Sequence, residues 1–408
     1  MLESLLRDLA PRVLSDLTRR SGQFDLSEDA VQEALLAAAT QWPGAGIPGN
    51  PRAWLLTVAS RRLTDLIRAD SARRRREMAP DVTVTAPAAD ADHTGDRDDS
   101  LQLLFLCCHP ALSQASQIAL TLRSVGGLTT AQIAHAFLIP EATMAQRISR
   151  AKKILAEQGA RFQMPSAEEF PARLGAVRHV LYLIFNEGYT ASSGPDLIRV
   201  DLSFEAIRLT RALHQVLASD GEVTGLLSLM LLTDARRPAR IDGNGALVPL
   251  AAQDRTAWNH GMIAEGIALV TAALSSAPLG PYQIQAAIAA VHSEAPDTAA
   301  TDWPQILGLY ALLEQISPSP VVTLNRAVAL AEVYGPDAGL RLLDGLDDDR
   351  NLASQHRLPA VRGHLHELAG DRDAARDAYL VAARRTTSLP EKRYLERKAA
   401  TLSPAPAE

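Results

Sequence analysis

Residues 128–155 read "LTTAQIAHAFLIPEATMAQRISRAKKIL" and carry the strongest structural signal in the chain. Two helical patterns flank the short turn "FLIP", and in the second the apolar residues recur every three or four positions, at Met144, Ile148, Ala151 and Leu155. This spacing places them on one face of a helix. A pair of helices on a short turn, with the second helix rich in basic side chains, is typical of a DNA-binding helix-turn-helix.

The polar residues of the second helix support the same interpretation. Thr143 is expected to cap this helix, because a threonine hydroxyl accepts a hydrogen bond from a free amide of the first turn. Residues 123–161 hold six basic and two acidic residues, a net charge of +4. An ordinary helical hairpin with a solvated face would share this pattern, so the stretch alone leaves both interpretations open. The basic residues largely off the apolar stripe are Arg147, Arg150, Lys152 and Lys153.

The N-terminal residues 1–78 predict another basic module made of helices. The stretch "DLSEDAVQEALLAAATQW" predicts a helix that starts at Ser27, and residues 43–51, "PGAGIPGNP", interrupt it with three prolines and three glycines. A helix then resumes through residues 52–77, which hold eight arginines and three acids. Guanidinium groups bind phosphates in bidentate fashion, and the ring of Trp54 can stack on an unpaired base.

An acidic stretch separates the two basic modules. Residues 81–99 hold six acids and one arginine among Pro, Ala and Thr, which predicts a flexible linker over residues 79–99. The second module is expected over residues 100–158. Since the whole chain of 408 residues has a net charge of -6, any nucleic-acid surface must be local. Two basic modules joined by a linker suit two sites on one nucleic acid.

Composition predicts an all-α, cytoplasmic protein. Leu and Ala dominate and aromatic residues make up only 4 %, which favours helix over sheet. The charged, amphipathic start predicts no signal peptide, and no apolar run reaches the roughly 18 residues that a membrane span needs. The adjacent Cys107 and Cys108 form neither a disulfide framework nor a spaced metal motif. We expect them to be small apolar residues of a buried helix rather than a redox switch.

A helical extension is expected after the second module. Residues 159–196 predict a connecting helix and turn, and residues 197–402 predict helical hairpins of the tetratricopeptide kind. The stretches "ALAEVYGPDAGLRLLDGL" and "HELAGDRDAARDAYLVAA" each read as a helix, a turn with Gly and Asp, and a second helix, at an offset of about 35 residues. Residues 236–250 interrupt the pattern with two apolar runs around Gly-Asn-Gly, which predicts a short β-hairpin.

Taken in order, these segments resemble the extracytoplasmic-function sigma factors, the two-domain members of the sigma-70 family. The resemblance covers about the first 160 residues, from "DLSEDAVQEALLAAATQW" through the arginine-rich helix and the linker to residues 128–155. Residues 185–194, "FNEGYTASSG", and residues 231–259 are similar to segments of a subgroup with a large tetratricopeptide-like extension. With these included, the resemblance covers nearly the whole chain. It implies an alternative sigma factor whose extension is regulatory.

The resemblance implies a role for each basic module. The first would dock on core RNA polymerase and melt the minus-ten element of promoter DNA, with residues 43–51 holding a flipped base. The second would read the minus-thirty-five element in the major groove. The implied polymerase contacts are Asp29, Gln32 and Glu33. The implied DNA contacts are Trp54, Arg61, Arg62 and Arg68 at the minus-ten element, and Thr143, Gln146, Arg147, Arg150 and Lys153 at the minus-thirty-five element.

One departure from the family concerns the start of the recognition helix. Family members often carry Gly-Thr-Val-Lys-Ser-Arg there, whereas residues 142–147 of this chain read "ATMAQR". The base-reading set therefore differs from that of the family, which affects the promoter sequence more than the docking mode. The implied partners are core RNA polymerase, promoter DNA and a protein or small molecule that regulates the extension. The resemblance implies no cofactor, no metal and no membrane partner.

Two polar clusters of the extension allow further interpretations. Asn186, Glu187 and Tyr189 would suit a catalytic loop or a joint through which the extension acts on the promoter-reading helices. Residues 254–258, in "QDRTAWNHG", would suit a grip on an anionic ligand or a lock between helices. The sequence has no Gly-rich phosphate loop, "HExxH" or "GxSxG" motif. We therefore favour structural roles over catalysis, and predict that the protein is not an enzyme.

Two other classes of protein remain compatible with the sequence. One is a helix-turn-helix regulator with a repeat-type sensor domain that never joins polymerase. The other is a repeat-type adaptor whose basic helices are incidental. The N-terminal module argues against the first, because a simple regulator has no use for a Pro/Gly loop and an arginine-rich helix ahead of a linker. The adaptor predicts no salt-dependent binding to DNA.

Overall fold

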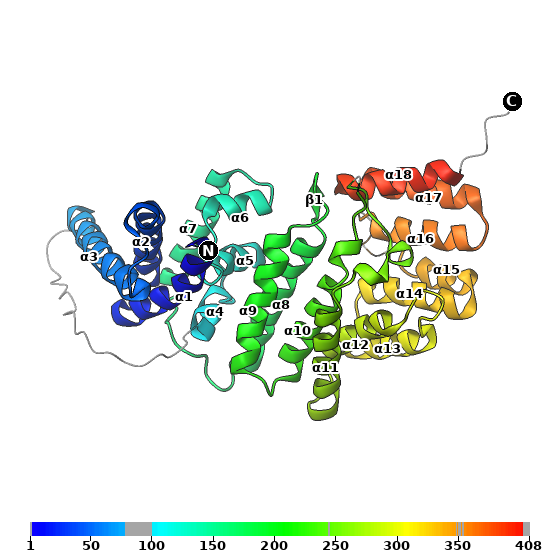
Figure 1. Cartoon of the computed structure of the whole chain (residues 1–408), viewed down its shortest axis with the longest axis horizontal. Helices are drawn as coiled ribbons and strands as arrows, with labels where there is room; N and C mark the ends of the chain where they lie inside the picture. The colour runs from blue at the N-terminus through cyan, green and yellow to red at the C-terminus, as the bar shows by residue number, and fades with distance from the viewer. Residues whose placement is uncertain are drawn as a thin grey trace. The chain divides into compact units, whose positions relative to one another are not determined.

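The computed structural model describes residues 2–77 and 100–402, apart from 244, 348, 350, 351, 353 and 354. The chain is 75 % helical, which confirms the predicted all-α class. It divides into two compact units, residues 1–183 and 184–408, and Figure 1 shows helices throughout both. The acidic linker predicted over residues 79–99 lies outside the described residues.

Three helices that pack against one another form the N-terminal module: α1 (Leu2–Ser21), α2 (Phe24–Ala45) and α3 (Pro51–Glu77). Apolar side chains from all three are buried, among them Leu14, Val31 and Leu55. The rings of Trp42 and Trp54 meet edge to face with centroids 5.3 Å apart, an arrangement that aromatic pairs prefer. This contact joins the end of α2 to the start of α3.

The start of α2 differs from the prediction. The helix begins at Phe24 rather than at Ser27, which is buried inside the first turns with its hydroxyl 2.9 Å from that of Ser21. The cause is Gly22, which ends α1 with a left-handed φ of 68° and lets the chain turn into the next helix almost at once.

The predicted break over residues 43–51 is also shorter in the structure. Pro43 lies within the last turn of α2, where it lacks the amide that would donate to the carbonyl oxygen four residues earlier, so the helix continues for only two residues beyond it. The helix stops at Gly46, whose φ of 85° is left-handed and whose amide donates to the carbonyl oxygen of Trp42 at 2.9 Å. Only residues 46–50 are irregular.

The second module contains the predicted helix-turn-helix. The first helix of the motif starts with a capping box, in which Thr129 and Gln132 each bond the backbone amide of the other. The predicted cap at Thr143 is wrong, because the second helix begins at Glu141 behind Pro140 and Thr143 lies inside its first turn. The helices of the module are α4 (Ser100–Cys107), α5 (Gln114–Ser124), α6 (Thr130–Ala136) and α7 (Glu141–Glu157).

Both cysteines are buried in the core of this module, as the packing interpretation predicted. Cys107 and Cys108 have no exposed surface, and the Cys108 sulfur lies 3.6 Å from the hydroxyl of Thr121. Burial raises the pKa of the Cys108 thiol to about 12. A thiol in this state is a poor nucleophile at neutral pH.

The second unit is built from helices that pack mainly on their neighbours in sequence, as expected for helical-hairpin repeats. The unit boundary falls inside α8 (Phe170–Tyr189), between residues 183 and 184. The following helices are α9 (Val200–Val216), α10 (Gly221–Asp234), α11 (His260–Ser276), α12 (Pro281–Glu294), α13 (Trp303–Ile316), α14 (Pro320–Tyr334), α15 (Pro336–Asp344), α16 (Arg357–Leu368), α17 (Arg372–Arg385) and α18 (Leu389–Leu402). Short side chains cap many of them, including Asp220, Asn259, Asp302, Ser319 and Asp371.

The segment between α10 and α11 contains the predicted hairpin in its shortest form. Ile241 and Leu247 form a single antiparallel bridge, and the amide of Val248 donates to the carbonyl oxygen of Arg240 at 2.9 Å. Three short 3-10 helices surround it: η1 (Arg237–Ala239), η2 (Leu250–Ala252) and η3 (Arg255–Ala257).

A two-stranded parallel sheet in the second unit was not predicted. β1 (Ser193–Gly194) pairs with β2 (Thr387–Ser388), and the Thr387 hydroxyl donates to the carbonyl oxygen of Ser192 at 2.7 Å. The pairing joins the segment after α8 to the segment before α18. It therefore joins the connecting segment ahead of the extension to the last part of the extension.

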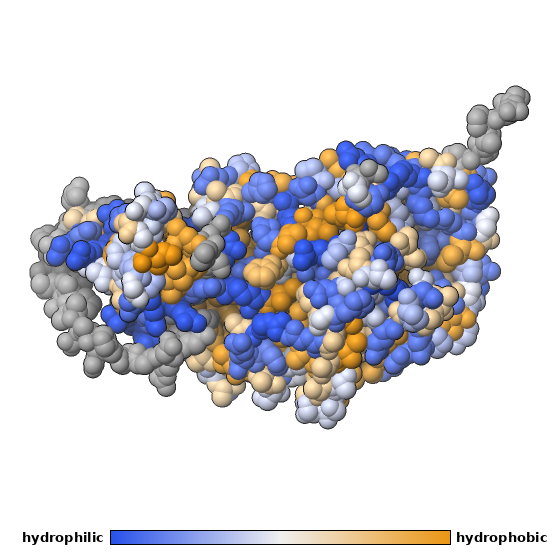
Figure 2. Space-filling view, in the orientation of Figure 1, coloured by the Kyte–Doolittle hydropathy of each residue, from blue (hydrophilic) through white to orange (hydrophobic). Residues whose placement is uncertain are grey.

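The surface seen in Figure 2 is mainly hydrophilic, with apolar patches between the polar regions. Large apolar side chains that are exposed include Leu36 in the first unit and Phe204 and Tyr334 in the second. Among the described residues, no helix combines the length and apolar character that crossing a membrane would require.

Candidate polymerase and nucleic-acid interfaces

The recognition helix α7 has two sides of different chemistry. Its apolar stripe is fully buried, from Met144 to Leu155. At 3.6 residues per turn, the residues predicted to read the minus-thirty-five element fall within an arc of about 120° beside that stripe. Four of these five side chains are exposed, and the fifth, Arg147, is half-buried. The structure thus brings together Thr143, Gln146, Arg147, Arg150 and Lys153 on one accessible side.

The residues predicted for the minus-ten element lie along α3. Trp54, Arg61 and Arg68 follow at intervals of seven residues, which keeps them close to one face over a length of about 21 Å. Arg61 and Arg68 are exposed, and Trp54 is half-buried against Trp42. The tryptophan therefore has a packing role, and only part of its ring is free to stack on a base.

The predicted polymerase contacts share one side of α2. Asp29 and Glu33 are exposed and Gln32 is half-buried between them. Glu33 forms an ion pair with Arg62 of α3. The structure thereby places one predicted DNA contact directly beside one predicted polymerase contact.

Lys152 is the basic residue of α7 that departs from expectation. The sequence placed it among the basic residues that lie largely off the apolar stripe, but its side chain is only 7 % exposed. Its ammonium lies 3.2 Å from Asp25, 3.1 Å from Glu28 and 2.5 Å from Asp29, all on α2. Burial lowers the pKa of this ammonium, but the three carboxylates outweigh burial and hold the pKa above its usual range.

Comparison with known proteins identifies these two modules. Residues 5–73 match Sigma-70 region 2, and residues 102–155 match Sigma-70 region 4. The chain is 31 % identical over 146 residues to the ECF RNA polymerase sigma factor SigK of Mycobacterium sp. (strain KMS), a match that covers 34 % of this chain and 72 % of that protein. The chain belongs to the extracytoplasmic-function (ECF) sigma factor family. SigK of Mycobacterium sp. (strain JLS) matches with the same identity and coverage.

The similarity of this ECF sigma factor to known proteins extends beyond region 4. Residues 173–274 match a family of unknown function, DUF6596. An uncharacterized protein of Rhizobium meliloti (strain 1021) is 41 % identical over 406 residues, which covers 97 % of this sigma factor and 95 % of that protein. No solved structure matches the chain. The two sigma-70 domains imply binding to core RNA polymerase and promoter DNA.

In the extension of the sigma factor, Glu187 and Tyr189 are held in place by neighbouring groups. The carboxylate of Glu187 accepts the amide of Ser192 at 3.2 Å. The guanidinium of Arg240 covers the ring of Tyr189 at 3.6 Å and donates to the Thr190 hydroxyl at 2.9 Å. Both predicted side chains thus stabilise the turn between α8 and β1.

Asn186 contributes to the same turn through its backbone. Its carbonyl oxygen accepts the amide of Thr190 at 2.8 Å, which extends the last turn of α8. Arg240 is buried, and its position in the sequence did not mark it as a functional residue. The available signal was a cluster of arginines ahead of the hairpin, but nothing in the sequence showed which of them would be covered.

Residues 254–258 lock helices together. The Asp254 carboxylate accepts the amide of Thr256 at 2.9 Å and caps η3. Arg255 donates to the carbonyl oxygens of His292 and Ala295, at 2.7 Å and 2.6 Å, and so satisfies the end of α12. Its guanidinium also stacks over the buried ring of Trp258 at 4.7 Å. Because Asp254 and Arg255 are engaged in these contacts, residues 254–258 do not form the arrangement that would bind an anionic ligand.

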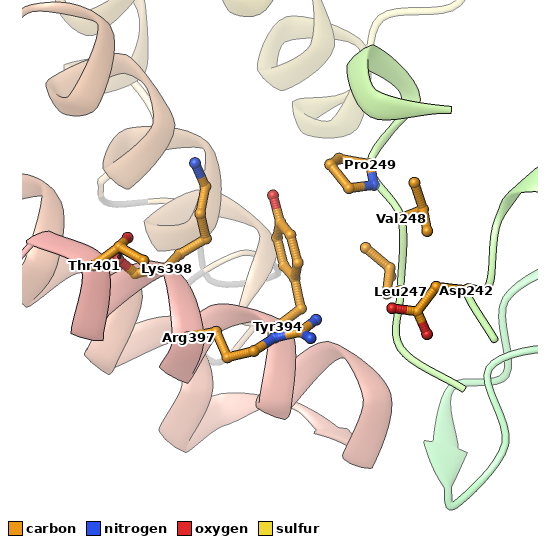
Figure 3. A pocket seen from close by; sticks show the side chains of 8 residues that line it. All are labelled: Asp242, Leu247, Val248, Pro249, Tyr394, Arg397, Lys398 and Thr401. Atoms are coloured by element: carbon orange, nitrogen blue, oxygen red, sulfur yellow. Dashed lines mark hydrogen bonds between the residues drawn. The ribbon is translucent and has the colours of Figure 1, made fainter. Parts of the chain in front are cut away.

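A shallow hollow of about 270 Å³ lies between the hairpin and α18 (Figure 3). Figure 3 shows Tyr394, Arg397 and Lys398 on the helix facing Val248 and Pro249 of the hairpin segment. The ammonium of Lys398 is engaged with Glu367 at 2.7 Å. The hollow is therefore a partly apolar surface feature rather than an enclosed ligand site.

Proposed function

We propose that this protein is an alternative sigma factor that binds core RNA polymerase through α2 and directs it to a small set of promoters. In this proposal α3 opens the minus-ten element and α7 reads the minus-thirty-five element. The observation that carries the proposal is the arc of five polar side chains on α7, which stays accessible while the apolar stripe of the same helix is buried. A helix of this shape fits the major groove.

The side chains of the arc supply suitable chemistry for base reading. Arg147 and Arg150 can each make two hydrogen bonds to a guanine edge, and Gln146 can do the same with adenine. Thr143 and Lys153, the first and last of the five residues along the helix, suit contacts to phosphate oxygens, which set the register of the helix on the duplex.

The side chains along α3 suit a single strand. Arg61, Arg62 and Arg68 provide phosphate contacts, and the accessible part of Trp54 provides a stacking surface. In the proposal, the irregular residues 46–50 hold a base that has left the duplex, because a pocket for a flipped base needs backbone that is free of helical hydrogen bonds.

We propose the following organisation for the chain, which acts in the cytoplasm and catalyses no reaction of its own. Region 2 spans residues 1–78 and a linker follows over residues 79–99; region 4 spans 100–158, a connecting segment 159–196, and the helical extension 197–402. The extension regulates the sigma factor in response to a protein or a small molecule. Because α8 is shared by both units, residues 186–189 at its end are the proposed junction for this control.

The function is tested by transcription with purified components. Full-length protein added to core RNA polymerase should give run-off transcripts from promoters recovered in a genomic selection. The double substitution Arg147→Ala/Arg150→Ala should weaken promoter binding and relax its sequence preference, while polymerase binding persists. Arg161→Ala, an exposed arginine just beyond α7, is the matched control.

Two results would contradict the proposal. DNA binding without polymerase binding or transcripts would favour the helix-turn-helix regulator. The absence of salt-dependent DNA binding would favour the adaptor. Regulation is tested by Glu187→Gln and Tyr189→Phe in the full chain, which should change transcript yield without changing promoter preference.

A further inference from the structure

Lys152 lies on the recognition helix but outside its DNA-reading arc. At 3.6 residues per turn, its side chain is about 160° from the middle of the arc, on the far flank of the buried stripe. The neighbouring Lys153 is 76 % exposed, whereas Lys152 is 7 % exposed. The side chain is covered because α7 contacts α2 of region 2 at this point.

Two further contacts hold region 4 against region 2. Arg123 of α5 donates to Glu28 of α2 at 2.9 Å, and the Glu28 carboxylate is only 2 % exposed. Gly127, in the loop after α5, adopts a left-handed φ of 67° and lies so close to α1 that a Cβ there would be 3.2 Å from backbone atoms of Arg7. Region 4 therefore touches both α1 and α2, and the contact is more than one ion pair.

The charges at this contact are matched across the two regions. Region 2 contributes three carboxylates from a short part of α2, and region 4 contributes the two cations Lys152 and Arg123. Separation of the regions would leave the acidic side of α2 without these cations. A partner that replaced region 4 would have to offer basic side chains in their place.

The acidic side of α2 is also the proposed polymerase surface. Asp29 is the nearest partner of Lys152, at 2.5 Å, and it is one of the proposed polymerase contacts. Gln32 and Glu33 follow on the same side of the helix within about 100°. Region 4 and core RNA polymerase would thus compete for one carboxylate.

We propose that region 4 closes over the acidic side of α2 in the free protein, and that Lys152 must leave Asp29 before core RNA polymerase can bind. The closed form is an autoinhibited state, in which the back of the recognition helix occupies the surface needed for assembly. This inference rests on the proposed function of α2 in polymerase binding.

A closed state lowers the apparent affinity for polymerase by the fraction of molecules that are open. Lys152→Ala removes the cation that pairs with Asp29 and leaves Arg123 as the remaining basic partner of Glu28, which disfavours the closed state. We expect this full-length variant to bind core RNA polymerase about tenfold more tightly than the natural chain, in line with a shift of the closed-to-open ratio by that factor. Lys152→Arg keeps the charge and should behave like the natural chain.

The test combines an affinity with a distance. Binding of each full-length variant to purified core RNA polymerase is measured by fluorescence anisotropy, with Arg161→Ala as the exposed basic control. Energy transfer between dyes on Thr64→Cys in α3 and Gln158→Cys after α7 reports closure, since both sites are exposed and both native cysteines are buried. Transfer should be high in the natural chain and in Lys152→Arg, and lower in Lys152→Ala. Thermal unfolding of each variant shows that it is folded.

The outcomes test autoinhibition separately from the proposed function. Tighter polymerase binding together with reduced transfer supports autoinhibition. Equal polymerase affinity of Lys152→Ala and the natural chain overturns autoinhibition while leaving the proposed function intact, and so does unchanged transfer. Failure of every variant to bind polymerase overturns the proposed function and the inference with it.

Discussion

Gly188 allows a sharply defined prediction for the extension. It is the penultimate residue of α8, and its carbonyl oxygen accepts the amide of Arg199 at 2.7 Å. A Cβ at this position would lie 2.2 Å from the amide nitrogen of Ser203 and 2.8 Å from its Cα. Because these are backbone atoms of α9, no side-chain rotation can relieve the clash. Gly188→Ala must therefore push the two helices apart.

The change in the free energy of unfolding combines one stabilising and two destabilising contributions. Alanine favours a helix over glycine by roughly 1 kcal/mol. Overpacking with a backbone shift costs about 1–3 kcal/mol, and weakening the Arg199 hydrogen bond costs about 1 kcal/mol more. We expect Gly188→Ala to destabilise the second unit by about 2 kcal/mol.

Gly175 provides a matched control within the same helix, since a Cβ there would meet no atom within 4 Å. Gly175→Ala should keep or raise stability by up to about 1 kcal/mol. Stability is measured by amide hydrogen exchange under increasing urea, with peptides from α8 and α9 resolved by mass spectrometry so that each unit is followed separately. Unchanged or greater protection of α9 in Gly188→Ala would refute the close approach of the two helices.

Three further predictions concern other parts of the chain. Met144→Ala should leave a cavity under the recognition helix, destabilise the first unit by about 2–5 kcal/mol and reduce promoter binding, as measured by urea unfolding and a DNA-binding titration. Cys108, with its pKa raised to about 12 by burial, should resist a thiol reagent at pH 8 until the protein is unfolded; rapid labelling of the native chain would contradict this. Burial and two neighbouring arginines lower the pKa of His292 to about 4, so the unfolded chain binds this proton first as the pH falls. Stability should be fully present above about pH 6.5 and decline by about 2–3 kcal/mol toward pH 4, a decline that His292→Gln should reduce in unfolding experiments.

Local sequence was sufficient for the helix-turn-helix because its determinants are close together along the chain. The apolar stripe of α7 recurs with the period of a helix, and the Thr129 capping box spans four residues. The hairpin between α10 and α11 was likewise predicted from local sequence, because Gly-Asn-Gly lies between two apolar runs. The ends of α2 were less well predicted. The sequence marked its start by Ser27 and its end by Pro43, whereas in the structure the left-handed Gly22 and Gly46 set them.

The polar clusters of the extension show where sequence reasoning stopped. Glu187 and Tyr189 have side chains that serve catalysis and structure equally well, so the sequence alone did not show which groups they contact. In the structure Glu187 contacts Ser192 and Tyr189 contacts Arg240. The pairing of β1 with β2 was beyond prediction, because two-residue strands have no period and the partners are far apart in sequence.

By itself, the sequence determined the helical class, the order of the two basic modules and the apolar side of α7 that is buried. These properties depend on side-chain period and local charge, which are written along the chain. The tertiary structure alone decided the environment of Lys152. On the helix it is one more basic residue beside Lys153, but three carboxylates of α2, more than a hundred positions away in sequence, make it a buried ion-pair partner. Charge is a property of the residue, whereas burial and partner are properties of the packed chain.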